Sequence, residues 1–332
     1  MGFFNNRLNA QVDFFRRVRT GLPAGRYDVL LPSELGFSLP KENLNSDVHI
    51  GYDAMVRWTD NINDFNYSVA GNVTYSRFYD WEQYDDRRSN SWDRYRNSIW
   101  HRVGYINWGH EVVGRFKDWE DIANYPIDND RKGNTTIVPG DFKYKDVNGD
   151  GVINGMDERP IGYRSDSTPN LNYGINVAAS WKGFDFAMDW TGSGLSSWAQ
   201  RYETARPFQN DGNSPSEVFK DAWHLADIWD ADSELIPGKY PLVRLGDNDS
   251  SYWTSDFWLH NVRYIKLRNL ELGYTLPKVI TTKAGISSMR VYLSGTNLLT
   301  FSNVPVDPEG IADNGLDYPT MRVINIGVNL KF

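Results

Sequence analysis

The chain reads Leu171-Asn-Tyr-Gly-Ile-Asn-Val-Ala-Ala-Ser-Trp-Lys-Gly-Phe-Asp-Phe-Ala-Met-Asp-Trp190, and this stretch decides its fold class. Apolar residues alternate with polar or small ones on both sides of Lys182-Gly183, which places each set on one face of a strand. A Lys-Gly pair suits a two-residue hairpin loop whose second residue takes φ > 0. In that register Trp181 opposes Phe184, and the apolar side chains of both strands share one face. The sequence therefore predicts an amphipathic β-hairpin.

The same alternation recurs along the chain, most clearly at residues 48–58 and 65–75. Strands of roughly 11 residues are about twice the usual globular length and about what a tilted membrane strand needs. Within residues 264–276 the alternation shifts phase near Arg268-Asn269, as a β-bulge would cause. Further strands are predicted at residues 8–14, 98–108, 135–145, 171–181, 184–190, 291–296 and 324–332, and a helix at 215–228 with Ser214 as its N-cap.

Short and long connections tend to alternate between these strands, as they do in outer-membrane barrels. The predicted fold class is all-β: an antiparallel transmembrane β-barrel segment of about ten strands with long extracellular loops. Trp58, Trp181 and Trp190 are expected in the aromatic girdles at the membrane interfaces. The apolar faces are expected to meet lipid, and the residues expected to face the lumen are Asn66, Asn72, Asn172, Asn176, Asp185, Asp189, Asn325 and Asn329.

The composition excludes several classes of function. The 332 residues include no cysteine, so there is no disulfide framework, thiolate metal site or cysteine nucleophile. The net charge of −8, without a stripe of Lys and Arg, argues against nucleic acid as a partner. The five histidines are scattered, and no nucleotide-binding or hydrolase motif is present. We therefore expect no enzymatic activity.

One local motif points to a metal ion. Oxygen-bearing side chains occupy positions 1, 3, 5, 9 and 12 of the loop that begins at Asp146, with glycine at position 6. This spacing matches a calcium loop of the EF-hand type, in which the position-7 ligand is a backbone carbonyl. Position 12 is an aspartate rather than the usual glutamate, and a turn without an ion is the alternative. The predicted structural Ca²⁺ ligands are Asp146, Asn148, Asp150, Val152, Asn154 and Asp157.

Several tryptophans lie in the long segment 192–260 and are the candidate substrate contacts. Flat aromatic faces suit stacking against sugar rings, whereas packing of a large loop against itself explains them equally well. The candidates are Trp198, Trp223, Trp229 and Trp253.

Taken together, several stretches resemble one family. They are Gly140-Asp-Phe-Lys-Tyr-Lys-Asp146, Tyr264-Ile-Lys-Leu-Arg-Asn-Leu-Glu-Leu-Gly-Tyr-Thr-Leu-Pro277, Arg290-Val-Tyr-Leu-Ser-Gly-Thr-Asn-Leu-Leu299 and the last strand, which ends in Phe332. They are similar to the C-terminal part of TonB-dependent outer-membrane transporters of the SusC/RagA-like, starch-utilisation type found in Bacteroidetes.

The resemblance implies a 22-stranded barrel that imports oligosaccharides or peptides. It also implies a SusD-like surface lipoprotein as lid, and energy from the TonB complex through an N-terminal part. The sequence shows no signal peptide and no plug domain, so residues 1–332 are expected to be the C-terminal part of such a barrel. The alternative is a secreted, calcium-stabilised β-module that binds glycans. A glycoside hydrolase ranks last, because no two carboxylates stand out.

Overall fold

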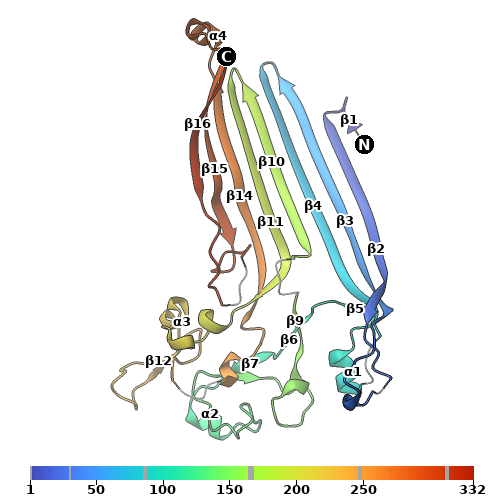
Figure 1. The fold of residues 1–332 in the computed structure, drawn as a ribbon. Coiled ribbons are helices and arrows are strands. Elements are labelled where there is room, and N and C mark those ends of the chain that lie inside the picture. Colours follow the sequence, from blue (N-terminus) through green and yellow to red (C-terminus); the bar gives the residue numbers. More distant parts are fainter. Residues whose placement is uncertain (1, 30, 85–87, 164–167, 246–248, 311–313) are drawn as a thin grey trace.

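A long, curved antiparallel sheet forms the body of the protein, and the loops gather beyond one of its ends (Figure 1). The computed structural model describes residues 2–332 except 30, 85–87, 164–167, 246–248 and 311–313. Among the described residues, no helix is both long enough and apolar enough to cross a membrane. The predicted all-β fold class is confirmed.

The long strands lie side by side in the order β2-β3-β4-β10-β11-β14-β15-β16. The two-residue strands β1 (Gly2–Phe3) and β5 (Arg102–Val103) pair with β2 and β4. Several strands exceed the predicted 11 residues, and β3 has 21. The bounds are β2 Leu8–Ala24, β3 Glu42–Ile62, β4 Phe65–Glu82, β10 Leu171–Trp181, β11 Phe184–Ala199, β14 Leu259–Thr275, β15 Ser288–Ser302 and β16 Val323–Lys331.

The hairpin of β10 and β11 has the predicted turn and register. Lys182 and Gly183 both have positive φ, at 46° and 92°, so the two-residue loop follows the twist of the strands. Trp181 pairs with Phe184 directly beside this turn. The hairpin prediction is therefore confirmed.

A β-bulge interrupts β14 where the sequence pattern slips. The register with β15 shifts between Leu267 and Asn269, as predicted. A second irregularity lies between Ser193 and Ser196 of β11, where Leu195 takes φ 58°. The sequence does not predict this second irregularity, because consecutive residues of β11 are buried here and apolar and polar residues no longer alternate.

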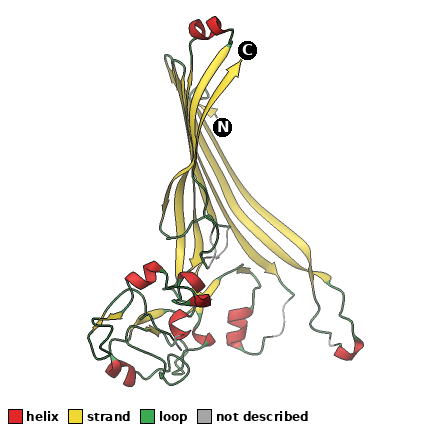
Figure 2. Ribbon diagram, turned by 60° about the vertical axis from the view of Figure 1, so that its left-hand side comes forward, coloured by secondary structure: helices red, strands yellow, loops and turns green. Residues whose placement is uncertain are grey.

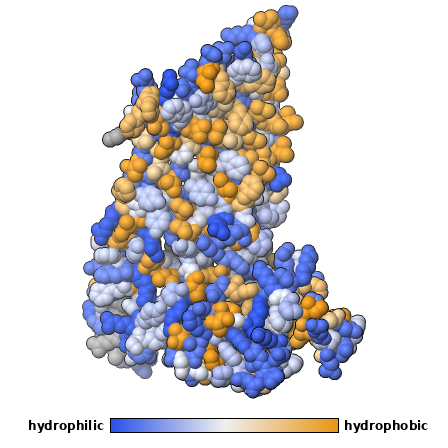
Figure 3. Space-filling view, turned by 180° about the vertical axis from the view of Figure 1, so that it is seen from behind, coloured by the Kyte–Doolittle hydropathy of each residue, from blue (hydrophilic) through white to orange (hydrophobic). Residues whose placement is uncertain are grey.

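The outward face of the sheet is apolar and exposed (Figure 3). Phe14 is 82% exposed and Ile326 is 80% exposed, although both lie within strands. At the end of the sheet that carries the short turns, the ring centroids of Phe184 and Tyr274 lie 4.4 Å apart. A continuous apolar face of this kind is the surface that a membrane strand turns toward lipid.

Most of the loops at this end of the sheet fold into a region of short elements, and the connection between β2 and β3 stands apart from it (Figure 2). Its short strands form two-stranded pairs, and its helices have seven residues or fewer. The bounds are α1 Ser91–Asn97, β6 Asn107–Gly109, β7 Val112–Arg115, α2 Trp119–Ala123, β8 Phe142–Tyr144, β9 Arg159–Gly162, α3 Ser216–Lys220, β12 His224–Leu225 and β13 Leu235–Ile236; α4 Lys278–Thr281 lies in a connection at the opposite end of the sheet.

Three predicted elements are shorter here than expected. The helix at 215–228 is wrong beyond Lys220, because the backbone N–H of Trp223 bonds to the carbonyl of Tyr240 instead of continuing the helix. Ser214 is not its cap: Pro215 holds that position without a side-chain bond. The strand at 98–108 is two short strands, β5 and β6, and the strand at 135–145 is reduced to β8.

Candidate functional site

An aromatic cluster holds the loop region together. Tyr144 is fully buried beside Trp258 and Phe142, and its hydroxyl donates to the carbonyl of Ser250 at 2.6 Å. Burial raises the pKa of Tyr144 well above its usual range. Because Tyr144 and Ser250 are 106 residues apart, this cluster joins the two longest loops into one body.

A buried ion pair ties the same loops together. Asp141 is 1% exposed and lies 2.8 Å from the guanidinium of Arg244, and the hydroxyl of Ser251 donates to the other carboxylate oxygen at 2.8 Å. Separating the two charges would leave the carboxylate of Asp141 buried without a partner, which costs several kcal/mol. The pair therefore holds the two loops together. The loop that carries the calcium motif is therefore held on a rigid base.

The first half of the calcium motif has the backbone shape that such a loop requires. Both carboxylate oxygens of Asp146 accept backbone N–H groups, from Gly149 at 2.7 Å and Gly151 at 2.8 Å. The two glycines have φ of 76° and 82°, which L side chains rarely adopt. Ile153 is fully buried, and its N–H bonds to the carbonyl of Asp128, so the loop is docked on the segment next to it.

The second half folds back on its own side chains. Asp157 is 1% exposed and accepts the backbone N–H groups of Val147 and Asn154. The amide nitrogens of Asn148 and Asn154 both donate to Asp150, and the N–H of Val152 lowers the pKa of Asp150. Among the described residues, no three acidic, histidine or cysteine side chains converge as a metal site would require. The two glycines therefore have the conformations of such a loop, whereas its polar side chains bond to one another and to the backbone.

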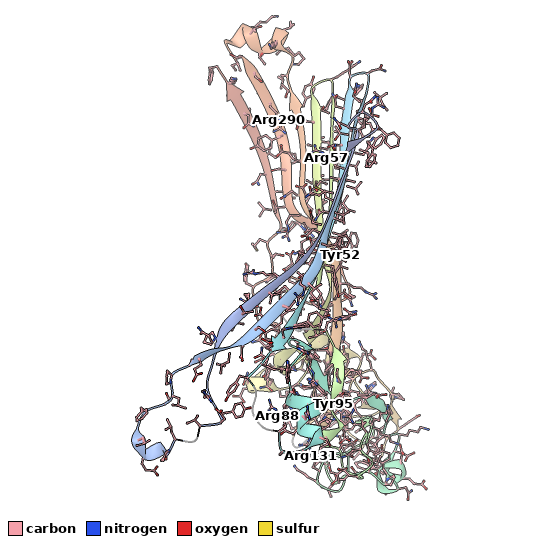
Figure 4. The ribbon with its side chains drawn as sticks, turned by 90° about the vertical axis from the view of Figure 1, so that its right-hand side faces the viewer. Tyr52, Arg57, Arg88, Tyr95, Arg131 and Arg290 are labelled. Atoms are coloured by element: carbon pink, nitrogen blue, oxygen red, sulfur yellow. The ribbon has the colours of Figure 1, made fainter. Side chains whose placement is uncertain are left out.

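The four candidate tryptophans do not lie together. Trp198 is 1% exposed and stacks on His260, and Trp223 is 8% exposed and packs against Gly140. Trp253 is partly buried between Tyr144 and the guanidinium of Arg131 (Figure 4 labels Arg131). Trp229 is 90% exposed. Packing of the loop against itself therefore explains Trp198 and Trp223, whose buried rings present no free face to a solute.

The polar residues predicted to face the lumen share the inner face of the sheet. Asn176 pairs with Asp189, and its amide donates to that carboxylate at 2.7 Å. On the other side, Asn269 of β14 donates to the second oxygen of Asp189 at 3.3 Å. The polar side chains thus form a hydrogen-bonded ladder across neighbouring strands, as expected of a wall that faces water.

An arginine spans three strands on this wall. Arg290 of β15 reaches Asp185 of β11, with Nε to Oδ1 at 3.0 Å, and also bonds to Glu271 of β14 (Figure 4 labels Arg290). The guanidinium crosses the backbone of β14 at Gly273, where a Cβ would collide with it. The sequence carries only an indirect signal for this arrangement, because the three charges and the glycine are adjacent only after the strands pair.

A buried lysine ties the connection between β15 and β16 to the same wall. Lys266 is 1% exposed, and its ammonium lies 2.9 Å from Glu309 and 3.3 Å from Asp307. Arg268 also pairs with Glu309. Lys266 pairs with Thr191 and Thr300 on the polar face, so its contacts with Asp307 and Glu309 hold that part of the connection over this face. The sequence does not predict this contact, because a lysine on the polar face of a strand is expected to point into water and its two partners lie about 40 residues away.

The chain is similar along its whole length to curated TonB-dependent receptors. TonB-dependent receptor P3 of Formosa agariphila is 26% identical over 355 residues, which cover 100% of this chain and 33% of that protein. TonB-dependent receptor SusC of Bacteroides thetaiotaomicron is 24% identical over 354 residues, covering 100% and 31%. The chain therefore spans about a third of the length of these relatives. No family model matches it.

Solved structures share the fold. The RagAB peptide importer in its open-open state superposes with a TM-score of 0.66 at 22% identity, over 100% of this chain and 33% of that one. The RagAB peptide transporter gives 0.65 at 22% identity, covering 100% and 34%. Along its whole length the chain thus matches the barrel of the SusC/RagA-like TonB-dependent receptors, which is the resemblance that its strand motifs predict.

Proposed function

We propose that the chain forms the C-terminal third of an outer-membrane barrel that imports a nutrient, with its long loops outside the cell. One observation carries the proposal: a sheet of membrane-length strands has one continuous apolar face and one hydrogen-bonded polar face. The match to TonB-dependent receptors supports it. The apolar face meets lipid, the polar face lines the lumen, and we assign the chain no enzymatic step.

The same apolar face argues against the alternative of a secreted glycan-binding module. Such a module would leave Phe14, Ile326 and their neighbours in water, where each apolar side chain costs about 1.5–3 kcal/mol relative to burial. In a bilayer the same residues are solvated by hydrocarbon. The lipid environment therefore accounts for the sequence pattern, and the secreted module does not.

Cysteine labelling tests which face is wet. The variants are made in the complete parent barrel, to which residues 1–332 contribute no cysteine background. Ile175 and Asn176 are adjacent on β10 and point to opposite faces. In cells, we expect a water-soluble maleimide to label Asn176→Cys faster than Ile175→Cys, with Ala178→Cys and Val177→Cys as the matched second pair. Faster labelling at 175 and 177 would overturn the assignment of the faces.

We further propose that the solute is an oligosaccharide or a peptide, that a SusD-like surface lipoprotein covers the loop end, and that TonB supplies energy through an N-terminal part. The similarity to TonB-dependent receptor SusC and to the RagAB peptide importer supports these assignments. Growth of a deletion strain on peptides or on oligosaccharides as sole carbon source tests the solute. Unimpaired growth of the deletion strain on both carbon sources would contradict the assignment of the solute.

The loop from Asp146 to Asp157 is proposed to bind a structural Ca²⁺. Its glycine conformations and six oxygen-bearing residues support this. We expect Asp146→Ala and Asp150→Ala each to abolish the calcium-dependent protease resistance of residues 140–157, and Asp211→Ala, an exposed loop carboxylate, to leave it unchanged. Equal resistance with and without calcium in the unaltered chain would contradict the site.

A further inference from the structure

A β-hairpin projects from the loop region with two large apolar residues at its tip. Strands β12 and β13 form its stem, and residues 226–234 form its tip, at the lower left of Figure 1. Ile228 is 72% exposed and Trp229 is 90% exposed. The ring of Trp229 makes no ring contact with any residue that the structure describes. An exposed apolar pair that is rimmed by polar residues is a candidate interaction site.

The stem of this hairpin is firmly attached to the loop region. The N–H of Trp223 bonds to the carbonyl of Tyr240 at 2.9 Å, and the N–H of Tyr240 bonds to the carbonyl of Asp221 at 2.9 Å. Tyr240 is 7% exposed and stacks on Trp258 in the aromatic cluster. The hairpin is therefore an arm with a buried base and an exposed end.

The tip itself is ordered by its own hydrogen bonds. The N–H of Ala226 bonds to the carbonyl of Glu234 at 2.8 Å. Ser233 closes the turn, since its hydroxyl donates to the carbonyl of Asp227 and accepts from the N–H of Asp227. The N–H of Trp229 donates to the carboxylate of Asp227 at 2.9 Å. Because the turn is already formed, binding through it loses little conformational entropy.

Acidic residues surround the two apolar side chains. The tip carries four carboxylates, and none of them forms an ion pair with any described residue: Asp227, Asp230, Asp232 and Glu234. A second copy of the tip, or an anionic lipid surface, would be repelled by this charge. The complementary occupant is a protein with an apolar pocket bordered by Lys or Arg.

We propose that Ile228 and Trp229 are the anchor by which this chain holds its surface lipoprotein, with both side chains inserted in an apolar pocket that has a basic rim. This inference rests on the proposed function, which supplies a lipoprotein at the loop end. An exposed tryptophan on a rigid arm is the residue type that dominates binding energy when it fills a pocket. The carboxylates steer the approach of the basic rim and raise the rate of association.

Photocrosslinking in cells tests the contact directly. A benzophenone amino acid is placed at position 229, and at position 119 as control, because Trp119 is also exposed, at 63%, and belongs to α2 rather than to the tip. We expect position 229 to capture a protein that carries a lipidated N-terminal cysteine, and position 119 not to capture it. An adduct with a second copy or with lipopolysaccharide, or no adduct at 229, overturns the proposal.

Affinity measurements with the captured lipoprotein then test the energetics. We expect Trp229→Ala to weaken binding about 30-fold, the loss typical of a truncated hot-spot residue, and Trp119→Ala to leave binding unchanged. The double variant Asp232→Asn and Glu234→Gln keeps every side-chain bond described for the tip. It should slow association severalfold and reduce its dependence on salt.

The outcomes separate this inference from the proposed function. If a surface lipoprotein copurifies with the chain but Trp229→Ala binds it as tightly as the unaltered chain, the anchor is wrong and the proposed function stands. If no lipoprotein copurifies with the unaltered chain, the lid assignment fails and the anchor fails with it. Retention of a sugar on Trp229, lost in Trp229→Ala, would assign the tip to the solute and overturn the inference.

Discussion

At the scale of single residues, one carboxylate organises a loop that the sequence leaves featureless. Asp130 is 7% exposed and accepts four hydrogen bonds, two from Thr136 and one each from the N–H groups of Lys132 and Asn134. Burial would raise the pKa of Asp130, but these bonds outweigh it and lower the pKa. Nothing in the residues around Asp130 distinguishes it from the other loop aspartates.

We expect Asp130→Asn to destabilise the segment 127–137 by about 2 kcal/mol at neutral pH, because an amide cannot accept all four bonds. A carboxylate whose folded pKa is lowered stabilises above its unfolded pKa, about 3.9, and loses this effect as the pH falls through the folded pKa. The difference between variant and unaltered chain should therefore shrink below about pH 4. Hydrogen exchange of residues 127–137 at pH 7 and pH 3 measures it.

Thr136→Val is the control for this prediction. It removes one of the four bonds that lower the pKa of Asp130 and keeps the carboxylate, so it should cost about 1 kcal/mol at neutral pH and weaken the pH dependence without abolishing it. A constant difference between Asp130→Asn and the unaltered chain from pH 7 to pH 3 would contradict the role of the charge.

At the scale of elements, strand pairing creates contacts that cross several strands. Gly273 is the clearest case, because Arg290 passes over its backbone to reach Asp185. Glycine weakens a strand unless a close approach requires it. A Cβ at Gly71 of β4 would meet only the carbonyl oxygen of Gly174, at 3.9 Å, so Gly71 serves as the comparison.

We expect Gly273→Ala to lower the thermal stability of the barrel, since the added Cβ displaces the guanidinium. Gly71→Ala should leave stability unchanged or raise it by about 0.5–1 kcal/mol. The temperature at which the full barrel unfolds in detergent gels measures both. Equal effects of the two substitutions would show that the position of the Arg290 guanidinium does not depend on the absence of a side chain at Gly273.

The connection between β15 and β16 is the second element whose position depends on pairing. Lys266→Met should release residues 303–322 from the wall, because Asp307 and Glu309 lose a buried cation, at a cost of about 3 kcal/mol. Limited proteolysis should then cut within 303–322. The control is Lys283→Met, which changes an exposed lysine at the other end of the sheet. If Lys266→Met were cleaved no faster than this control, Lys266 would not hold the connection in place.

At the scale of the whole molecule, the described sheet ends on one side at β2, which pairs with the short β1 only at Leu8 and Asn9, and on the other side at β16 (Figure 1). Unpaired backbone groups at an edge cannot persist in hydrocarbon, so a membrane barrel must be closed. The proposed function therefore requires that further strands pair with both edges.

We expect residues 1–332 produced on their own to form no closed barrel. The measurement is heat-modifiable migration on detergent gels together with channel conductance in planar bilayers. The positive control is the same segment within a chain that supplies the remaining strands. A heat-modifiable, conducting species from residues 1–332 alone would contradict this expectation.

The sequence predicts the sheet well because strand alternation is a local property. The turn at Lys182-Gly183, the register beside it and the bulge after Leu267 follow from the order of neighbouring residues. Prediction fails where strands continue beyond the apolar band, as in the last residues of β11, because both faces are packed there and the alternation is lost. The helix at 215–228 fails for a related reason: tertiary hydrogen bonds to Tyr240 replace its last turns.

By itself, the sequence determines the fold class, the facing of the strands and the resemblance to SusC/RagA-like receptors. It also supplies the motif that we propose binds calcium, whose candidate ligands lie within one short segment. Only the tertiary structure decides that Trp198 and Trp223 are buried while Trp229 projects on an arm, and that Lys266 and Arg290 are clamped by distant carboxylates. The physical reason is range, because alternation involves neighbouring residues, whereas Lys266 lies 41 positions from Asp307 and Arg290 lies 105 positions from Asp185.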